Sequence, residues 1–178
     1  MIIRIIALLV VLIVIIIFGI TYTIKQAQKS PFNSPANFLG ESEQDNDQKT
    51  VVCVGASITH GQVSYNYVNI LSDRFGHDDY QFVNAGINGN LAYNVVKRLD
   101  EIIKCDPDYV TVLIGTNDAN ASLSEKNSSR YMNDMALPEK PNAGFFRRNI
   151  KELIFQLKKQ TNAKIAILSL PPIGEEIK

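Results

Sequence analysis

The stretch TVVCVGASITHG at residues 50–61 sets the fold class that this sequence predicts. Its first five residues are apolar or β-branched, which is typical of a buried strand. A glycine and then Ser57 follow almost at once, in a short turn of the kind that leads from a strand into a helix. The stretch therefore predicts a strand over residues 50–54 and the start of an α/β unit.

The apolar pattern downstream alternates between strand and helix periods. Val95, Leu99 and Ile102, for example, form an i, i+4, i+7 stripe on one helix face. Strands that alternate with helices build a doubly wound parallel sheet with a helix layer on each face, a three-layer α/β/α fold. The pattern predicts further strands at residues 80–84, 108–114 and 164–170, helices at residues 65–75, 91–104 and 146–157, and a loop with a short helix within residues 119–141.

The composition limits the classes of partner. The sequence has 18 basic and 18 acidic side chains, and no basic cluster that would indicate a nucleic-acid surface. Cys53 lies in the first strand run, where we expect a small core residue, and together with Cys105 it gives no disulfide framework or metal-binding spacing. We therefore expect no nucleic acid, no metal ion and no cofactor.

Three polar loops follow the first three predicted strands, at residues 55–61, 84–90 and 115–118. The carboxyl ends of parallel strands meet at one edge of a sheet, so these loops should lie close together. Ser57 is placed as a nucleophile at a strand-to-helix turn, where backbone N–H groups would stabilise an oxyanion. The Gly89 N–H group and the Asn117 side-chain amide would donate to the same oxygen.

Other interpretations of the first loop exist. Ser57 alone would be read as a helix cap, and the loops alone as ordinary turns. A phosphate-binding loop would need Gly-Lys-Ser/Thr, but Gln62 follows Gly61. The Gly-x-Ser-x-Gly elbow of the α/β-hydrolases is also absent, because Thr59 holds its last position. These failures disfavour a nucleotide-binding domain.

The order and spacing of the three loops resemble a known family, the SGNH or GDSL-like serine ester hydrolases. Residues 55–59 look like its first block, residues 84–89 like its second and residues 115–118 like its third, and the resemblance extends over residues 50–175, including LPPIGE at residues 170–175. It implies a flavodoxin-like fold, Ser57 as the nucleophile, and an oxyanion hole formed by Ser57 N–H, Gly89 N–H and the Asn117 side chain.

The sequence departs from the family at two points. Ala56 stands where the family usually has an aspartate that helps to hold the nucleophile loop. The family's Asp-x-x-His block, which supplies the base, is not reached, because the sequence stops eight residues after the last predicted strand. His60, three residues after Ser57, is a poor substitute because a helix amino terminus disfavours its cation, and His77 is expected at the opposite end of the sheet. Asp118 is expected to bond to loop backbone.

The leading hypothesis is a hydrolase of acyl esters, with a small-molecule, glycan or lipid substrate, that works through a seryl-acyl intermediate. The alternative is a catalytically inactive, C-terminally truncated fragment that binds an acyl or glycan ligand. Without the last strand and its covering helix, the sheet should also expose an apolar face and an open edge, which predicts aggregation or a need for a partner.

The first 49 residues predict an anchor and a tether. Residues 5–24 carry no charged side chain, which indicates a transmembrane helix within residues 1–24. A cleaved signal peptide is the competing interpretation, but no small-residue cleavage site follows the run, and a buried core helix would need a larger protein around it. Residues 25–49 read as a polar linker and residues 50–178 as the domain. The charges that flank the run barely decide its orientation in the membrane, because Arg4 lies on one side and Lys25 and Lys29 on the other. The habit of anchored hydrolases favours a domain outside the cytoplasm.

Overall fold

The computed structural model describes residues 2–27, 29–40, 47–62, 65–76 and 79–170. The chain forms two compact units, residues 1–30 and residues 31–178.

The first unit is one helix, α1 (Ile2–Ala27), of 26 residues. The helix confirms the predicted secondary structure of this segment, and its side chains at residues 10–22 are exposed. The predicted membrane span is not supported, because no helix among the described residues is long and apolar enough to cross a membrane.

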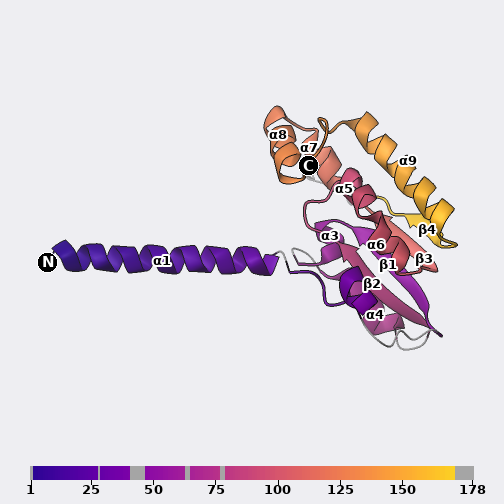
Figure 1. The fold of residues 1–178 in the computed structure, drawn as a ribbon, viewed down its shortest axis with the longest axis horizontal. Coiled ribbons are helices and arrows are strands. Elements are labelled where there is room, and N and C mark those ends of the chain that lie inside the picture. The colour runs from indigo at the N-terminus through magenta and orange to yellow at the C-terminus, as the bar shows by residue number, and fades with distance from the viewer. Residues whose placement is uncertain (1, 28, 41–46, 63–64, 77–78, 171–178) are drawn as a thin grey trace, which may run out of the picture. The chain divides into compact units, whose positions relative to one another are not determined.

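The second unit is built on a parallel sheet of four strands, β1 (Lys49–Gly55), β2 (Tyr80–Gly86), β3 (Tyr109–Leu113) and β4 (Lys164–Ile167). Their order is β2-β1-β3-β4, which is also the order of the first four strands in flavodoxin-like sheets (Figure 1). The fold is thus α/β with a parallel sheet, consistent with the flavodoxin-like domain that the sequence predicts.

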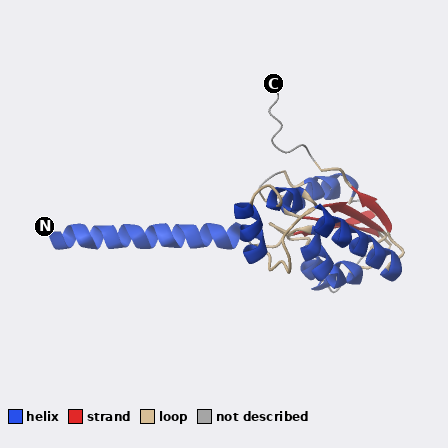
Figure 2. Ribbon diagram, turned by 90° about the horizontal axis from the view of Figure 1, so that it is seen from above, coloured by secondary structure: helices blue, strands red, loops and turns tan. Residues whose placement is uncertain are grey.

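Helices cover both faces of this sheet, because its central strands alternate apolar side chains between two cores. Val52 and Val54 of β1 belong to the main core, under α5 (Ala92–Lys97), α6 (Leu99–Lys104) and α9 (Ala143–Gln160). Val51 and Cys53 point the other way, into a smaller core with Val68 of α4 (Tyr67–Phe75). Full burial of one such valine is worth about 1.5–3 kcal/mol relative to exposure. Figure 2 shows the strands, in red, between these helices.

Two further helices begin directly after the carboxyl ends of strands, and a third follows the second of these along the chain. The one-turn helix α3 (Ser57–His60) comes directly after β1, and α7 (Thr116–Ala121) directly after β3. Then α8 (Glu125–Asp134) begins after its cap Ser124. Most of the segment that sequence analysis treats as a loop with a short helix, residues 119–141, is therefore helical.

The segment predicted as a linker, residues 25–49, is packed in part against the sheet. Within it, α2 (Pro35–Gly40) contributes Phe38, which is only 8% exposed, to the main core. Asn33 extends the edge of β2, since its carbonyl accepts a hydrogen bond from Asn84 N–H at 2.8 Å and its side-chain amide donates to Phe82 O at 3.0 Å. The folded unit thus begins near Pro31, ahead of the predicted boundary at residue 50.

The helix predicted at residues 91–104 is interrupted at Arg98. This residue ends α5 and precedes α6, with φ of −114°. The interruption turns the Arg98 side chain toward the carboxyl ends of the strands, where it bonds to the site described next.

Candidate active site

Ser57 is the first residue of α3, immediately beyond the carboxyl end of β1. Its side chain is half-buried, and no other described residue forms a hydrogen bond with its hydroxyl group. The turn is closed by the backbone, because His60 N–H donates to Ala56 O at 2.9 Å and Gly61 N–H donates to Ser57 O at 3.1 Å. The chain therefore presents the serine hydroxyl at the sheet edge, as the sequence predicts.

Two glycines let the first loop, residues 55–61, lie close to the ends of β1 and β2. A Cβ atom at Gly55 would overlap the Thr59 side chain, and one at Gly86 would overlap the backbone of His60. A side chain at Gly86 would force the first loop away from the end of β2, and one at Gly55 would displace Thr59 from the end of β1.

Asn84 joins the same two segments through hydrogen bonds. It is fully buried in β2, and its side-chain amide donates to Thr59 O at 2.9 Å while its Oδ1 accepts from Gly86 N–H at 3.0 Å. A buried amide left without partners would cost about 1–3 kcal/mol, so this pairing fixes the contact between the first and second loops.

The second loop carries Gly89, whose φ of 79° lies in the left-handed region that favours glycine. A Cβ atom there would meet the Met135 side chain. In the third loop, the Asn117 side-chain amide donates to Asn90 O at 3.0 Å, and its Oδ1 accepts from Tyr131 O–H at 2.9 Å. The second and third loops, which carry two of the three predicted oxyanion donors, are therefore joined to each other.

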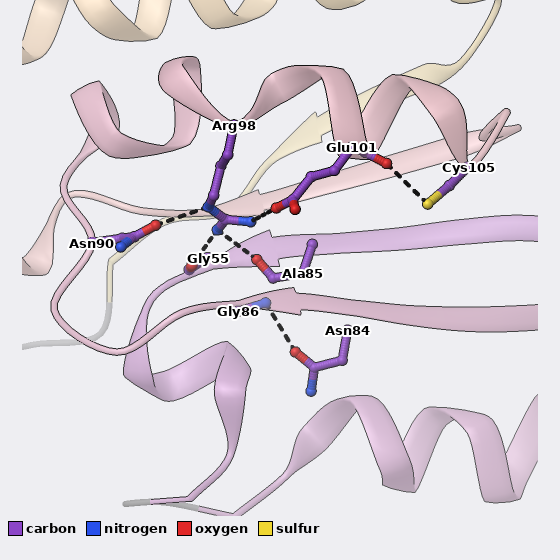
Figure 3. A network of polar contacts seen from close by, with 8 residues as sticks. All are labelled: Gly55, Asn84, Ala85, Gly86, Asn90, Arg98, Glu101 and Cys105. Carbon is purple, nitrogen blue, oxygen red and sulfur yellow. Dashed lines mark hydrogen bonds and ion pairs between the residues drawn. The ribbon is translucent and has the colours of Figure 1, made fainter. Parts of the chain in front are cut away.

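Arg98 ties the ends of β1 and β2 together, as Figure 3 shows. Its guanidinium donates to Ala85 O at 2.7 Å and to Gly55 O at 3.4 Å, and its Nε donates to Asn90 Oδ1 at 2.9 Å. Burial lowers the pKa of Arg98, and the ion pair with Glu101 at 2.9 Å opposes that effect. Each nitrogen of this largely buried guanidinium thus has a hydrogen-bond partner, as a charge removed from water requires.

Asp118 holds the start of α5 against the third loop. Its carboxylate accepts a hydrogen bond from Ala92 N–H at 3.2 Å, so Asp118 bonds to backbone as predicted, at the first residue of a helix rather than in a loop. The side chain is only 5% exposed, and this burial raises its pKa to about 6, partly opposed by the bond from Ala92.

The histidines do not complete a triad in the described residues. His60 is buried in the last turn of α3, and His77 lies outside the described residues. Ala56, which replaces the family's usual aspartate, is buried as part of the main core. In the part of the chain that the structure describes, no group of three His, Cys, Asp or Glu side chains is placed to hold a metal ion.

Cavities lie at both ends of the strands, and a third, of about 320 Å³, lies on one face of the sheet, lined among others by Val51 and Phe82. One of about 270 Å³ lies beside the third loop, lined among others by Gly115, Phe146 and Leu170. A larger one of about 540 Å³, with Lys49 and Asp108 in its lining, lies at the amino ends of the strands. The smaller cavity lies at the carboxyl ends of the strands, where the reactive groups of a parallel sheet gather, but Ser57, Gly89 and Asn117 are not among its lining residues.

Sequence analysis missed two residues that organise the site. The sequence does signal Arg98, because this residue places a charge on an otherwise apolar helix face, between Val95 and Ile102. No sequence pattern signals Tyr131, because it reaches the site only through a hydrogen bond to Asn117, 14 positions away.

The fold and the site together define a flavodoxin-like α/β protein with a polar site at the carboxyl edge of its sheet. Residues 53–177 match the GDSL-like lipase/acylhydrolase family, and the chain belongs to that family.

Three solved structures with the same fold are an acetylxylan esterase, a GDSL-like lipase and the protein TesA. An acetylxylan esterase from Geobacillus stearothermophilus, Axe2, is 19% identical, with a TM-score of 0.52 over 67% of this chain and 58% of that one. A GDSL-like lipase from Bacteroides thetaiotaomicron is 21% identical, with a TM-score of 0.51 over 74% of this chain and 54% of that one. TesA is 23% identical, with a TM-score of 0.52 over 70% of this chain and 63% of that one.

At these identities the likeness shows the fold. The chain spans less than two thirds of the length of each of these structures. No curated protein matches the sequence.

Proposed function

We propose that this protein hydrolyses acyl esters, with Ser57 as the nucleophile and with Gly89 N–H and the Asn117 amide as oxyanion donors. Membership of the GDSL-like family supports a hydrolase. The observation that carries the site is the bond from Asn117 to Asn90 O, because it holds one predicted donor beside the loop of the other, at the edge where Ser57 stands.

In the proposed reaction, the Ser57 oxygen attacks the ester carbonyl carbon and a base takes the hydroxyl proton. The bond between the carbonyl carbon and the alcohol oxygen breaks, the alcohol leaves with a proton, and water then releases the acid from the acyl-serine. Oxyanion donors stabilise the negative oxygen formed at each attack, and one such donor is typically worth about 10²–10³-fold in rate.

The alternative, a protein that binds an acyl or glycan ligand without turnover, is favoured by one observation. No described residue forms a hydrogen bond with the Ser57 hydroxyl, so none is placed there as its base.

Hydrolysis of p-nitrophenyl acetate separates these functions, with imidazole added over a concentration series as an external base. We expect hydrolysis that rises with imidazole in the wild-type chain, beyond the background of imidazole alone, and that falls to background in Ser57→Ala. Ser129→Ala, at an exposed position on α8, is the matched control and should behave as wild type.

Equal rates for the wild-type chain and Ser57→Ala at every imidazole concentration would contradict the proposed hydrolase. Saturable binding of an acetylated ligand without Ser57-dependent turnover would then support the alternative. Acetylated xylo-oligosaccharides are suitable first ligands, because Axe2 acts on acetylxylan; other glycan, lipid and small-molecule esters follow.

The location of the protein remains a prediction from the sequence. The charge-free run at residues 5–24 predicts membrane attachment, and the habit of anchored hydrolases favours a domain outside the cytoplasm. Carbonate extraction of cell membranes, followed by protease treatment of intact cells, measures both points. Release of the protein by carbonate would count against membrane attachment. Protection of the domain from protease in intact cells would count against a domain outside the cytoplasm.

A further inference from the structure

We propose that Tyr131 of α8 is a positioning residue that orients the Asn117 amide toward the oxyanion. This inference rests on the proposed function, in which Asn117 donates to the substrate oxygen. Tyr131 itself touches no reacting atom in this proposal; it acts through Asn117.

The hydrogen bonds of the Asn117 amide leave one donor available. Its Oδ1 is occupied by the Tyr131 hydroxyl at 2.9 Å, and one of its two N–H groups is directed to Asn90 O at 3.0 Å. An amide flipped by 180° would place its oxygen against the Asn90 carbonyl and its NH₂ group against the tyrosine hydroxyl. The observed partners therefore select one orientation and leave the second N–H group for a ligand.

The direction of the Tyr131 proton is set by a third residue. The Asn120 side-chain amide donates to the Tyr131 oxygen at 3.3 Å, which occupies that oxygen as an acceptor. The tyrosine hydroxyl is therefore left to donate its proton to Asn117. A chain of three side chains thus runs from α7 to α8 and back to the site.

Packing keeps the tyrosine ring in place. Tyr131 is 7% exposed and belongs to a small core with Leu91, Ala121 and Leu137, separate from the core under the sheet. One helical turn later, the Met135 side chain fills the space beside Gly89. The carboxyl end of α8 therefore contacts both loops that carry the proposed oxyanion donors.

The substitution Tyr131→Phe tests this role, because it keeps the ring and removes only the hydroxyl. We expect Ser57 of the full chain to react with a fluorophosphonate about 10-fold more slowly, a part of the 10²–10³-fold that loss of a whole donor costs. The matched control is Tyr93→Phe, the same change in a tyrosine beside the same small core, which should leave the rate unchanged.

A double substitution distinguishes positioning from general structure. In an Asn117→Ala background, Tyr131→Phe should slow the reaction no further, because its effect passes through Asn117. An equal slowing in both backgrounds, or no slowing in either, would overturn the inference.

A readout independent of activity keeps the test decisive if the proposed function fails. In ¹⁵N-labelled full chain, the two side-chain amide protons of Asn117 should give distinct, slowly exchanging signals in the wild type, and faster exchange with solvent in Tyr131→Phe. Absence of Ser57 reaction in the wild type would count against the proposed function alone. Identical Asn117 signals in the two proteins would overturn the positioning role.

Discussion

Asp118 is a buried carboxyl group with one backbone partner beside the candidate site. Because burial raises its pKa to about 6, the folded protein binds this proton more tightly than the unfolded chain, whose reference value is 3.8. Below about pH 4 the group is protonated in both states. As the pH rises from about 4 to 6, the unfolded chain releases its proton more readily, so this group's contribution to the free energy of unfolding falls.

The substitution Asp118→Asn should remove this pH dependence, because the amide oxygen still accepts from Ala92 N–H and carries no charge. We expect the free energy of unfolding of the wild type, relative to Asp118→Asn, to fall by about 2–3 kcal/mol between pH 4 and pH 7. Urea unfolding at a series of pH values measures the difference. A difference that is constant with pH, or that rises, would contradict the assigned burial of the charge.

Residues with local motifs could be predicted from the sequence, and those with distant partners could not. Ser57, Gly89 and Asn117 were named because each directly follows a strand run at one edge of a parallel sheet. The partners that fix them, Arg98 and Tyr131, bond to residues remote in the sequence, and no local pattern reports such bonds. The structure therefore adds the hydrogen-bond partners that hold the predicted site together.

At the scale of elements, strands were predicted more closely than helices. The predicted bounds of β1 and β2 lie within two residues of the observed ones, because a polar, glycine-containing loop follows each strand. The helix expected at residues 91–104 divides at Arg98, where no glycine or proline signals a break. The short helix α2 was missed because its polar, proline-containing surroundings resemble a linker.

The substitution Phe38→Ala tests whether α2 belongs to the folded domain. The ring lies in the main core, so its loss should lower the free energy of unfolding by about 3 kcal/mol. The neighbouring Leu39, which is exposed, gives the matched control Leu39→Ala, with an expected loss of about 1 kcal/mol or less. Denaturant unfolding of the three proteins measures both values, and equal stability of Phe38→Ala and wild type would show that α2 behaves as a tether.

At the scale of the whole molecule, β4 forms one edge of the sheet. Within the described residues no strand pairs with its outer side. Ile167 in this strand is 49% exposed, and Leu168 directly after it is also exposed. An apolar edge strand of this kind is a template for association with another chain, in line with the aggregation that the sequence predicts.

A charge at this edge should reduce association. We expect Leu168→Lys to lower the sedimenting fraction of the full chain at a fixed detergent concentration, because lysine on an edge opposes pairing with a second edge. The control Leu123→Lys changes an equally apolar, exposed residue away from the sheet and should have little effect. If both variants sediment as the wild type does, the β4 edge is not the surface that associates.

The location of a covalent fluorophosphonate adduct tests the central claim most directly. The full chain is treated with the probe and digested with trypsin, and the peptide of residues 50–74, which holds Ser57, Ser64 and Ser72, is sequenced by tandem mass spectrometry. The account predicts the added mass on Ser57 alone, and none after prior unfolding in urea. An adduct on another serine, or no adduct in the folded chain even with added imidazole, would contradict it.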